Sequence, residues 1–284
     1  MFKRILPVFL GFCLLIFLAA PALAEDHFFS VMLLGIDEKG LSDTEKSEAG
    51  RADAIMVASV NPTNGEIALA SIDRDTATEI SSAYTTAPGI NKLCVTAFFG
   101  GPELTLASVN SLFDLHIEYY MAIDKEGLRK VVDLMGGLDL EITKEERKEM
   151  PQLFRSAGQK HLSGKSILEY AGWRDFDAGP SSDIARTERQ RKVLSACMQK
   201  AQAMGFAKLA ELAPQMLPYV QTNIDVAGAL LLAGSFLNNP DVQLKEMRFP
   251  QDANRKVVNL HNVLLPTDWA KESQDLNAFL YPQP

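Results

Sequence analysis

Short apolar runs separated by polar turns fill the first third of the chain. Val31–Gly35 is apolar and ends in glycine, which predicts a buried strand, and Ala54–Val60 predicts a second. Asn64-Gly65 is a strong hairpin signal, so we expect Ile67–Ile72 to return as a third strand. The polar stretch at residues 38–50, rich in Glu, Lys and Ser, predicts a surface loop between the first two strands.

Helical patterns alternate with strand patterns through the rest of the chain. Pro102 and Glu103 suit the first turn of a helix that we expect to run to about Phe113. We expect further strands near residues 117–123, 138–142, 242–249 and 257–260. We expect further helices near residues 125–135, 163–170, 183–204, 207–219 and 225–238, and a final one from Asp268. This alternation indicates an α/β layered domain, and no linker divides the chain.

A leader of 24 residues precedes the predicted domain. Lys3 and Arg4 stand before an uncharged run, Ile5–Ala24, that is long enough to span a bilayer. Ala22-Leu23-Ala24 resembles a signal-peptidase site, so a cleaved signal peptide and a retained N-terminal membrane anchor both remain open. In either case Lys3 and Arg4 stay inside, and residues 25–284 form a single domain outside the cytoplasm.

The exported part of the chain is acidic. Removing Lys3 and Arg4 from the 28 basic residues leaves 26 against 36 acidic residues, a formal charge of −10. Such a body binds nucleic acid poorly, so we expect no nucleic-acid partner and look for a local basic cluster at any anion site. Cys94 and Cys197 make no disulfide framework and no metal-ligand spacing, which favours two unpaired thiols over a disulfide.

Two aspartates stand where loops meet the predicted strands. Asp37 follows Leu33-Leu34-Gly35-Ile36, and Asp53 follows Gly50-Arg51-Ala52. Taken singly, each acid is typical of a turn or helix cap. As a pair beside Arg74 they become candidates for a Mg²⁺ site, because Mg²⁺ takes one or two carboxylates and completes its shell with phosphate oxygens and water.

Three arginines are candidates for binding a phosphorylated substrate. Arg74 lies between Asp73 and Asp75, while Arg174 and Arg186 come a hundred residues later. The planar guanidinium binds two phosphate oxygens at once, so three of them suit a pyrophosphate. The alternative for each is a surface ion pair with a neighbouring acid, which contributes about 0–1 kcal/mol to stability.

The predicted long helix presents several of these polar residues. Arg186, Arg189 and Gln190 stand at i, i+3 and i+4, so we expect all three on one side of the helix. The alternative is a solvated helix face. Asp183 is either the N-cap of this helix or part of the site.

In residue identity and in order along the chain, these motifs resemble the LytR-CpsA-Psr (LCP) family of cell-envelope glycopolymer transferases. The resemblance covers nearly all of the exported body from about Phe29. The matching stretches are Leu33–Asp37, Gly50–Asp53, Ser71–Asp75, Gly100–Thr105, Tyr119–Gly137, His161–Gly164, Tyr170–Arg174 and Arg186–Gln190.

The resemblance implies a central mixed β-sheet flanked by helices on both faces and an apolar pocket for a lipid tail. We place that pocket along residues 109–113 and 128–135. Family members are exported enzymes that move a glycan-phosphate from a polyprenyl-pyrophosphate carrier to a hydroxyl on peptidoglycan. Teichoic acid and capsule attachment are reactions of this kind. The implied partners are therefore a polyprenyl-linked glycopolymer, a peptidoglycan acceptor and the outer surface of the cytoplasmic membrane.

The resemblance also implies roles for individual residues. Asp37 and Asp53 match the acids associated with a metal, which we expect to be Mg²⁺ or Mn²⁺. The residues implied at the diphosphate are Arg74, Arg174, Arg186, Arg189 and Gln190, and those implied in the chemical step are Arg74, Asp183 and Arg186. Asp183 either accepts the proton of the acceptor hydroxyl or orients Arg186.

The chain departs from the family pattern at several positions. Gly172 replaces a usual arginine, Asp73 a usual proline and Ala185 a usual glycine, while Cys94-Val95 replaces an Asn-His pair. Losing one anion-binding arginine would weaken substrate binding or shift the preferred glycopolymer. A hydrolase that uses water as acceptor, and a non-catalytic lipid- or glycan-binding regulator, remain as alternatives.

Overall fold

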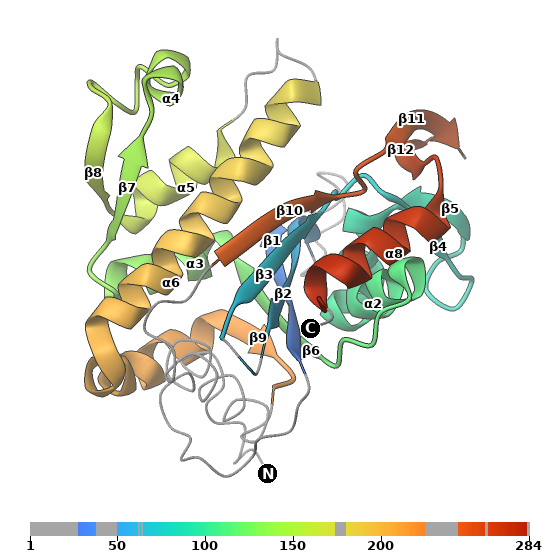
Figure 1. The fold of residues 1–284 in the computed structure, drawn as a ribbon, viewed down its shortest axis with the longest axis horizontal. Coiled ribbons are helices and arrows are strands. Elements are labelled where there is room, and N and C mark those ends of the chain that lie inside the picture. Colours follow the sequence, from blue (N-terminus) through green and yellow to red (C-terminus); the bar gives the residue numbers. More distant parts are fainter. Residues whose placement is uncertain are drawn as a thin grey trace.

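A six-stranded mixed β-sheet forms the centre of the computed structural model (Figure 1). The structure describes residues 28–37, 50–61, 63, 65–173, 180–224, 244–258 and 261–282. The strand order is β10-β3-β2-β1-β6-β9. The strands are β1 Phe29–Asp37, β2 Arg51–Val60, β3 Ile67–Ile72, β6 Tyr119–Asp124, β9 Val220–Thr222 and β10 Leu244–Phe249.

The pairing directions bring the functional strand ends to one edge of this sheet. β1 and β2 are antiparallel, as are β2 and β3, while β6 runs parallel to β1 and β10 runs parallel to β3. The carboxyl ends of β1, β3, β6 and β10 therefore lie beside the start of β2, and we call this the site edge. In open α/β sheets, ligands bind outside the carboxyl ends of the strands.

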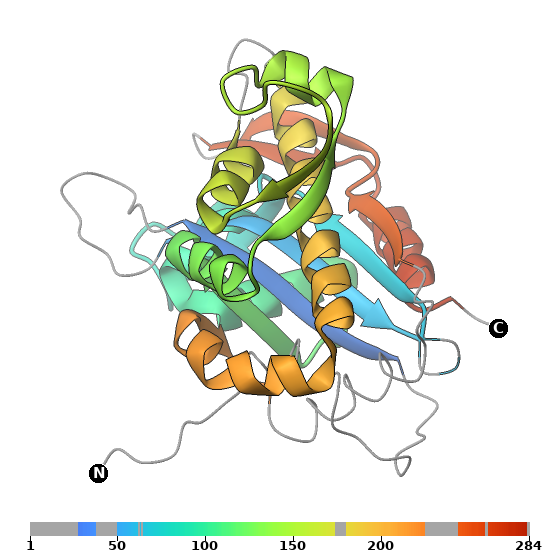
Figure 2. The same ribbon diagram turned by 90° about the vertical axis from the view of Figure 1, so that its left-hand side faces the viewer.

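Helices cover both faces of the sheet, which confirms the predicted fold class. α2 Thr96–Phe113 and α8 Trp269–Leu280 pack on one face, and α3 Lys125–Leu134 and α6 Pro180–Met216 lie on the other (Figure 2). Successive side chains of β2 point to opposite faces of the sheet, and both faces are buried. Val57 packs in the core under α2 and α8, whereas Met56 packs in the core that Leu194 and Met198 of α6 cover.

Smaller elements surround the sheet as two-stranded ribbons and short helices. The ribbons are β4 Ala77–Ile80 with β5 Gly89–Lys92, β7 Leu138–Ile142 with β8 Gly158–Leu162, and β11 Ala253–Val258 with β12 His261–Pro266. The remaining elements are α4 Lys144–Glu149, α5 Gly164–Gly172, and the 3₁₀ turns η2 Leu93–Val95 and η4 Leu217–Tyr219.

Local sequence chemistry accounts for several element ends. Ser163 caps α5 by accepting from Ser166 N, and Asp268 caps α8 by accepting from Lys271 N. After α3, Gly136 and Gly137 have φ values of 78° and 85°, which only glycine adopts without strain. These stops and starts are where the sequence predicts them.

Other elements match the predictions less simply. Residues 138–142 form the predicted strand, which pairs with β8 in a ribbon separate from the central sheet. Gly100 and Gly101 are non-helical and divide α2, so its second part begins at Pro102 and ends at Phe113 as predicted, while its first part from Thr96 was not predicted. The helix predicted at 207–219 continues α6 to Met216. Of the strand predicted near 257–260, residues 257 and 258 end β11 and residues 259–260 lie outside the described residues, while β12 was not predicted. The helix predicted at 225–238 also lies outside the described residues.

Some apolar residues in the ranges predicted to line a lipid pocket belong to the packed core. Val109 and Phe113 have 0% exposure and pack under α8, and Val132 has 0% exposure beside α5. The lipid pocket along residues 109–113 and 128–135 stays a prediction.

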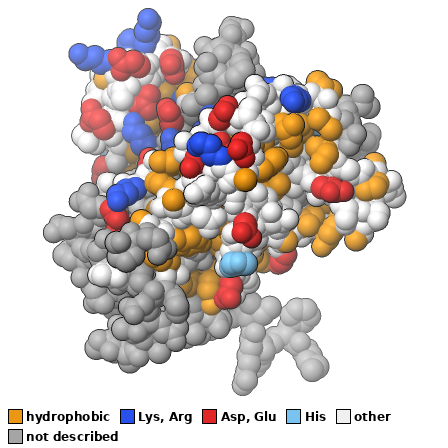
Figure 3. All heavy atoms as spheres, turned by 45° about the vertical axis from the view of Figure 1, so that its right-hand side comes forward, with side chains coloured by type: hydrophobic (Ala, Val, Ile, Leu, Met, Phe, Trp, Pro, Cys, Tyr) orange, Lys and Arg blue, Asp and Glu red, His pale blue; other side chains and the backbone are white. Residues whose placement is uncertain are grey.

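The described surface is mixed in charge. On the face drawn in Figure 3, acidic and basic side chains are scattered among apolar ones, without a broad basic area among the described residues. Within those residues, no helix is both long and apolar enough to cross a membrane. The predicted leader lies outside them.

Candidate functional site

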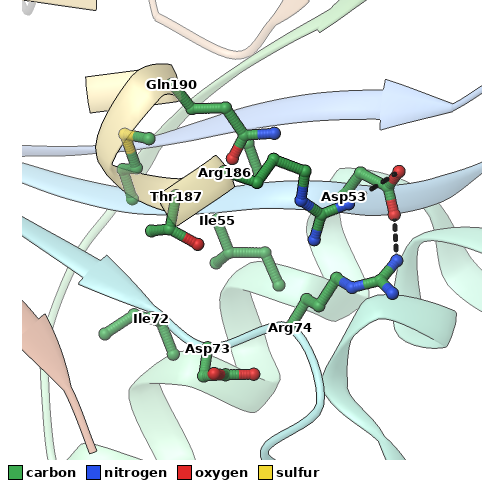
Figure 4. Close-up of a pocket in the computed structure, with 10 residues that line it drawn as sticks. Asp53, Ile55, Ile72, Asp73, Arg74, Arg186, Thr187 and Gln190 are labelled. Atoms are coloured by element: carbon green, nitrogen blue, oxygen red, sulfur yellow. Dashed lines mark hydrogen bonds and ion pairs between the residues drawn. The ribbon is translucent and has the colours of Figure 1, made fainter. Parts of the chain in front are cut away.

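A pocket at the site edge brings three parts of the chain together. Figure 4 shows Asp53 from β2 between Arg74, which follows β3, and Arg186 of α6. The lining residues are Asp53, Ala54, Ile55, Met56, Ile72, Asp73, Arg74, Arg186, Thr187 and Gln190.

A β-bulge places Asp53 in this pocket. The register between β1 and β2 passes from the pair Gly35–Ala54 to the pair Ile36–Ala52, so Asp53 is the extra residue. Such bulges re-aim a side chain beside a functional site. Asp53 Oδ1 accepts a hydrogen bond from Arg74 Nη1 at 2.5 Å, and its Oδ2 lies 3.7 Å from Arg186 Nη1.

The turn that carries Arg74 is held on several sides by backbone hydrogen bonds. Asp73 N donates to Phe249 O at 2.8 Å, Asp75 N donates to Asp73 Oδ1 at 2.9 Å, and Cys94 N donates to Arg74 O at 2.9 Å. Because both its ends and its centre are tied, the turn presents Arg74 in a preorganised position.

Carboxylates keep Arg74 charged and anchor its turn. Burial alone would lower the pKa of Arg74, but the Asp53 and Asp75 carboxylates raise it above its ordinary value. Burial alone would likewise raise the pKa of Asp75, yet hydrogen bonds from Arg255 at 2.8 Å and Lys92, whose Nζ lies 2.9 Å away, lower it. Asp75 is therefore a buried structural anion, and Asp53 is the acid that faces Arg74 in the pocket.

Arg186 and Gln190 share the pocket as predicted, but Arg189 lies outside its lining. Arg189 is 4% exposed and donates from Nη2 to Trp173 O at 2.5 Å, just beyond the end of α5. Burial lowers the pKa of Arg189. The prediction that all three side chains face one site is therefore wrong for Arg189, which binds a carbonyl at the C-terminus of a helix instead.

Helix geometry explains this difference. Successive residues turn by about 100°, so Gln190 lies about 40° from Arg186 on one side and Thr187 about 100° on that same side. Arg189 lies about 60° away on the opposite side. The pocket faces the side of α6 that carries Arg186, Gln190 and Thr187. The i, i+3, i+4 spacing alone does not show whether the pocket lies towards the i+3 residue or towards the i+4 residue.

Asp37 lies at the site edge but is not part of the pocket lining. Its Oδ1 is 2.8 Å from Lys125 Nζ, at the start of α3. A side chain at Gly50 would place its Cβ 1.5 Å from the Asp37 carbonyl oxygen, so glycine is required where the chain approaches the end of β1.

The donor set at the site edge suits a hard divalent cation that also binds phosphate. Asp37 and Asp53 come from paired strands, and each already lies beside a cationic side chain, Lys125 or Arg74. Two carboxylates completed by phosphate oxygens and water are typical of Mg²⁺. The described residues contain no group of three or more acids, histidines or cysteines arranged for a metal, and the metal role of these two aspartates stays a prediction.

Two predicted residues cannot be placed in the site. Arg174 lies outside the described residues, and Asp183 belongs to α6 by its backbone, while its side chain is not described. Gly172 ends α5, and a Cβ built there meets no atom within 4 Å.

Sequence reasoning missed part of the site. Thr187 lines the pocket beside the predicted Arg186, and its position next to that arginine was the available signal. Asp73, which the sequence offers only as a residue that orients Arg74, lines the pocket as well. Arg248, near the end of β10, lies with Nη2 2.5 Å from Asp73 Oδ2. Nothing in its local sequence points to the site, because its partner is 175 residues away.

Comparison with known proteins finds similarity along most of the chain. The model of the LytR_cpsA_psr family matches residues 19–277. The polyisoprenyl-teichoic acid–peptidoglycan teichoic acid transferase TagV of Bacillus subtilis (strain 168) is 27% identical over 210 residues, which cover 72% of this chain and 52% of TagV. The transferase TagU of Bacillus cereus (strain AH820) is 33% identical over 175 residues, which cover 60% of this chain and 52% of TagU. The chain thus spans about half the length of these curated relatives.

Solved structures share the fold. The structure of B. subtilis TagV has a TM-score of 0.70 at 22% identity and covers 92% of this chain and 100% of that chain. TagT (YwtF) of B. subtilis, solved with bound octaprenyl pyrophosphate lipid, has a TM-score of 0.64 at 19% identity and covers 89% of this chain and 90% of that chain.

Proposed function

The chain belongs to the LytR_cpsA_psr family, and from that premise we propose that it is an exported transferase. It takes a glycan-phosphate from a polyprenyl-pyrophosphate carrier and joins it to a hydroxyl on peptidoglycan, at the outer surface of the cytoplasmic membrane. The observation that carries this proposal is the convergence of Arg74 and Arg186 on one pocket at the site edge.

The chemistry of this pocket supports a diphosphate as ligand. Guanidinium groups bind phosphate oxygens in pairs, and both arginines are largely buried, with side chains 20% and 4% exposed. Water screens such charges less than it screens surface charges. TagT has been solved with octaprenyl pyrophosphate, a ligand of this chemical class, and the names of TagV and TagU describe the transfer of polyisoprenyl-linked teichoic acid to peptidoglycan.

The proposed reaction is a phosphoryl transfer. The acceptor hydroxyl oxygen attacks the phosphorus that bears the glycan, and a new P–O bond forms. The P–O bond to the polyprenyl phosphate breaks, and that phosphate leaves with the electron pair while the hydroxyl proton passes to a base. Arg74 and Arg186 stabilise the charge that develops on the leaving phosphate, a role in which arginine contributes about 10³–10⁵ in rate in other phosphoryl-transfer enzymes.

The acids complete the proposed site. Asp53 aligns Arg74 and Arg186 before substrate arrives, since each of its oxygens faces one guanidinium. Asp37 and Asp53 would hold Mg²⁺ or Mn²⁺, which supplies additional neutralisation of the phosphate oxygens when bound. We assign Asp183 to proton acceptance or to orienting Arg186.

A reconstituted reaction tests this function. The full chain is incubated with a polyprenyl-pyrophosphate-linked glycan and Mg²⁺, with and without peptidoglycan, and the products are separated by mass. We expect glycan joined to peptidoglycan together with polyprenyl phosphate. Release of free glycan-phosphate at equal rates with and without peptidoglycan would identify a hydrolase instead, and absence of metal-dependent turnover would identify a binding protein.

A further inference from the structure

The charges that line the pocket do not by themselves attract a diphosphate. The charged lining residues are two acids, Asp53 and Asp73, and two arginines, Arg74 and Arg186, so their formal charges cancel. Asp73 is the unexpected member, because its side chain is only 10% exposed and yet lines a pocket that we propose to bind an anion. Unless it is neutralised, such a buried carboxylate opposes the binding of phosphate.

Both oxygens of Asp73 have specific partners. Oδ1 accepts from Asp75 N at 2.9 Å and closes the turn around Arg74, while Oδ2 accepts from Arg248 Nη2 at 2.5 Å. The backbone adds a third link, since Asp73 N donates to Phe249 O at 2.8 Å. Arg248 therefore binds the Asp73 carboxylate, which in turn closes the turn that carries Arg74.

The strand that carries Arg248 also contacts the helix that carries Arg186. β10 is the outermost strand beside β3 in the described sheet, with Arg248 in register with Ser71. Two residues earlier on the same side of β10, Glu246 Oε2 lies 3.8 Å from Arg191 Nε of α6. β10 thus contacts both elements whose arginines meet in the pocket, the turn after β3 through Arg248 and α6 through Glu246.

We propose that Arg248 is a positioning residue that neutralises Asp73, leaves the pocket with a net positive charge and holds the Arg74 turn for diphosphate binding. This inference rests on the proposed function and extends it to a residue outside the pocket lining. Arg248 need not touch the substrate, because its effect passes through Asp73.

Paired substitutions separate this role from a general loss of structure. Arg248→Met removes the charge, and Asp73→Asn keeps an oxygen for the turn while removing the carboxylate that needs neutralising. Lys245→Met is the matched control, since Lys245 lies on the same strand and its Nζ is 2.7 Å from Glu66, while it is absent from the pocket lining. Arg248→Lys tests whether charge alone suffices.

The readout is the binding of inorganic pyrophosphate by calorimetry, at a temperature at which thermal unfolding shows every variant to be folded. A lost hydrogen bond between charged groups predicts binding about tenfold weaker for Arg248→Met. We expect the double variant Asp73→Asn/Arg248→Met to bind within about threefold of Asp73→Asn alone, because the charge that needed a partner is gone. Arg248→Lys and Lys245→Met should bind like the unmodified chain.

Several outcomes overturn the inference, and they differ from failure of the proposed function. If the unmodified chain binds pyrophosphate and transfers glycan but Arg248→Met binds it equally well, the inference alone fails. It also fails if Asp73→Asn does not restore binding to Arg248→Met. If Arg248→Met does not fold, Arg248→Gln, which also removes the charge, is measured in its place, and binding equal to that of the unmodified chain overturns the inference. An unmodified chain that neither binds pyrophosphate nor transfers glycan would overturn both proposals.

Discussion

Replacing Arg74 by alanine is the perturbation that separates function from stability most clearly. The Arg74 Nη1–Asp53 Oδ1 contact is 2.5 Å, and the two side chains are 20% and 23% exposed. Asp53 keeps Arg186 at 3.7 Å after the substitution, so its carboxylate is not left alone. We therefore expect a loss of about 1–2 kcal/mol in the free energy of unfolding, below the 3–5 kcal/mol typical of breaking a fully buried pair.

The expected effect on the reaction is larger. One of the two described arginines in the pocket is removed, and arginines in this role contribute about 10³–10⁵ in rate. Because Arg186 remains, we expect the lower end, about 10³, which corresponds to about 4 kcal/mol of transition-state stabilisation.

The assay is transfer from a polyprenyl-pyrophosphate-linked glycan to peptidoglycan, with chemical denaturation measured in parallel. Arg129→Ala is the control, because Arg129 is held by Glu126 on the surface of α3 and is absent from the pocket lining. Transfer by Arg74→Ala within about tenfold of the unmodified rate would refute the reasoning, since charge stabilisation predicts about 10³. So would a rate loss that is fully explained by the unfolded fraction.

Further substitutions test other parts of the account. Gly172→Arg should leave the melting temperature unchanged or higher, because a Cβ there meets no atom within 4 Å, and a lower melting temperature in a thermal scan would contradict this. The added guanidinium should also strengthen pyrophosphate binding. Arg189→Met should lower the free energy of unfolding by about 1–3 kcal/mol, since the Trp173 carbonyl loses its charged donor, while pyrophosphate binding by the folded protein stays within about twofold of normal; calorimetry showing a large binding loss would return Arg189 to the site. Burial raises the pKa of Cys94 to about 11 from an unfolded value of 9.0, so the stability this thiol contributes is present below pH 9 and is lost as pH rises towards 11. Denaturation between pH 8 and 11 should show that decline, and Cys94→Ala should reduce it; an identical decline in both proteins would contradict the assignment.

Much of the fold follows from local sequence chemistry. The Asn64-Gly65 hairpin signal places β3, Ile67–Ile72, with its observed bounds. Ser163 and Asp268 mark helix starts because their side chains accept hydrogen bonds from backbone N–H groups. The partner with which each strand pairs is harder to predict from the sequence. Leu138–Ile142 has an ordinary strand pattern, and nothing in that pattern says that it pairs with β8 instead of the central sheet.

The candidate site likewise contains residues that local motifs identify and a residue that only a tertiary contact reveals. Motif order identifies Asp53, Arg74 and Arg186, which the fold brings into one pocket. The metal role of Asp37 and Asp53 stays a prediction, as do the roles of Arg174 and Asp183. Arg248 was missed because its link to Asp73 is a tertiary contact between distant strands, which no local periodicity encodes.

A structure of the purified chain with polyprenyl pyrophosphate, determined in the presence of Mg²⁺, tests the central claim most directly. The account predicts that the diphosphate lies at the site edge, with its oxygens within hydrogen-bond distance of both the Arg74 and Arg186 guanidinium groups. A diphosphate bound elsewhere, with Asp53 still holding both arginines, would contradict it.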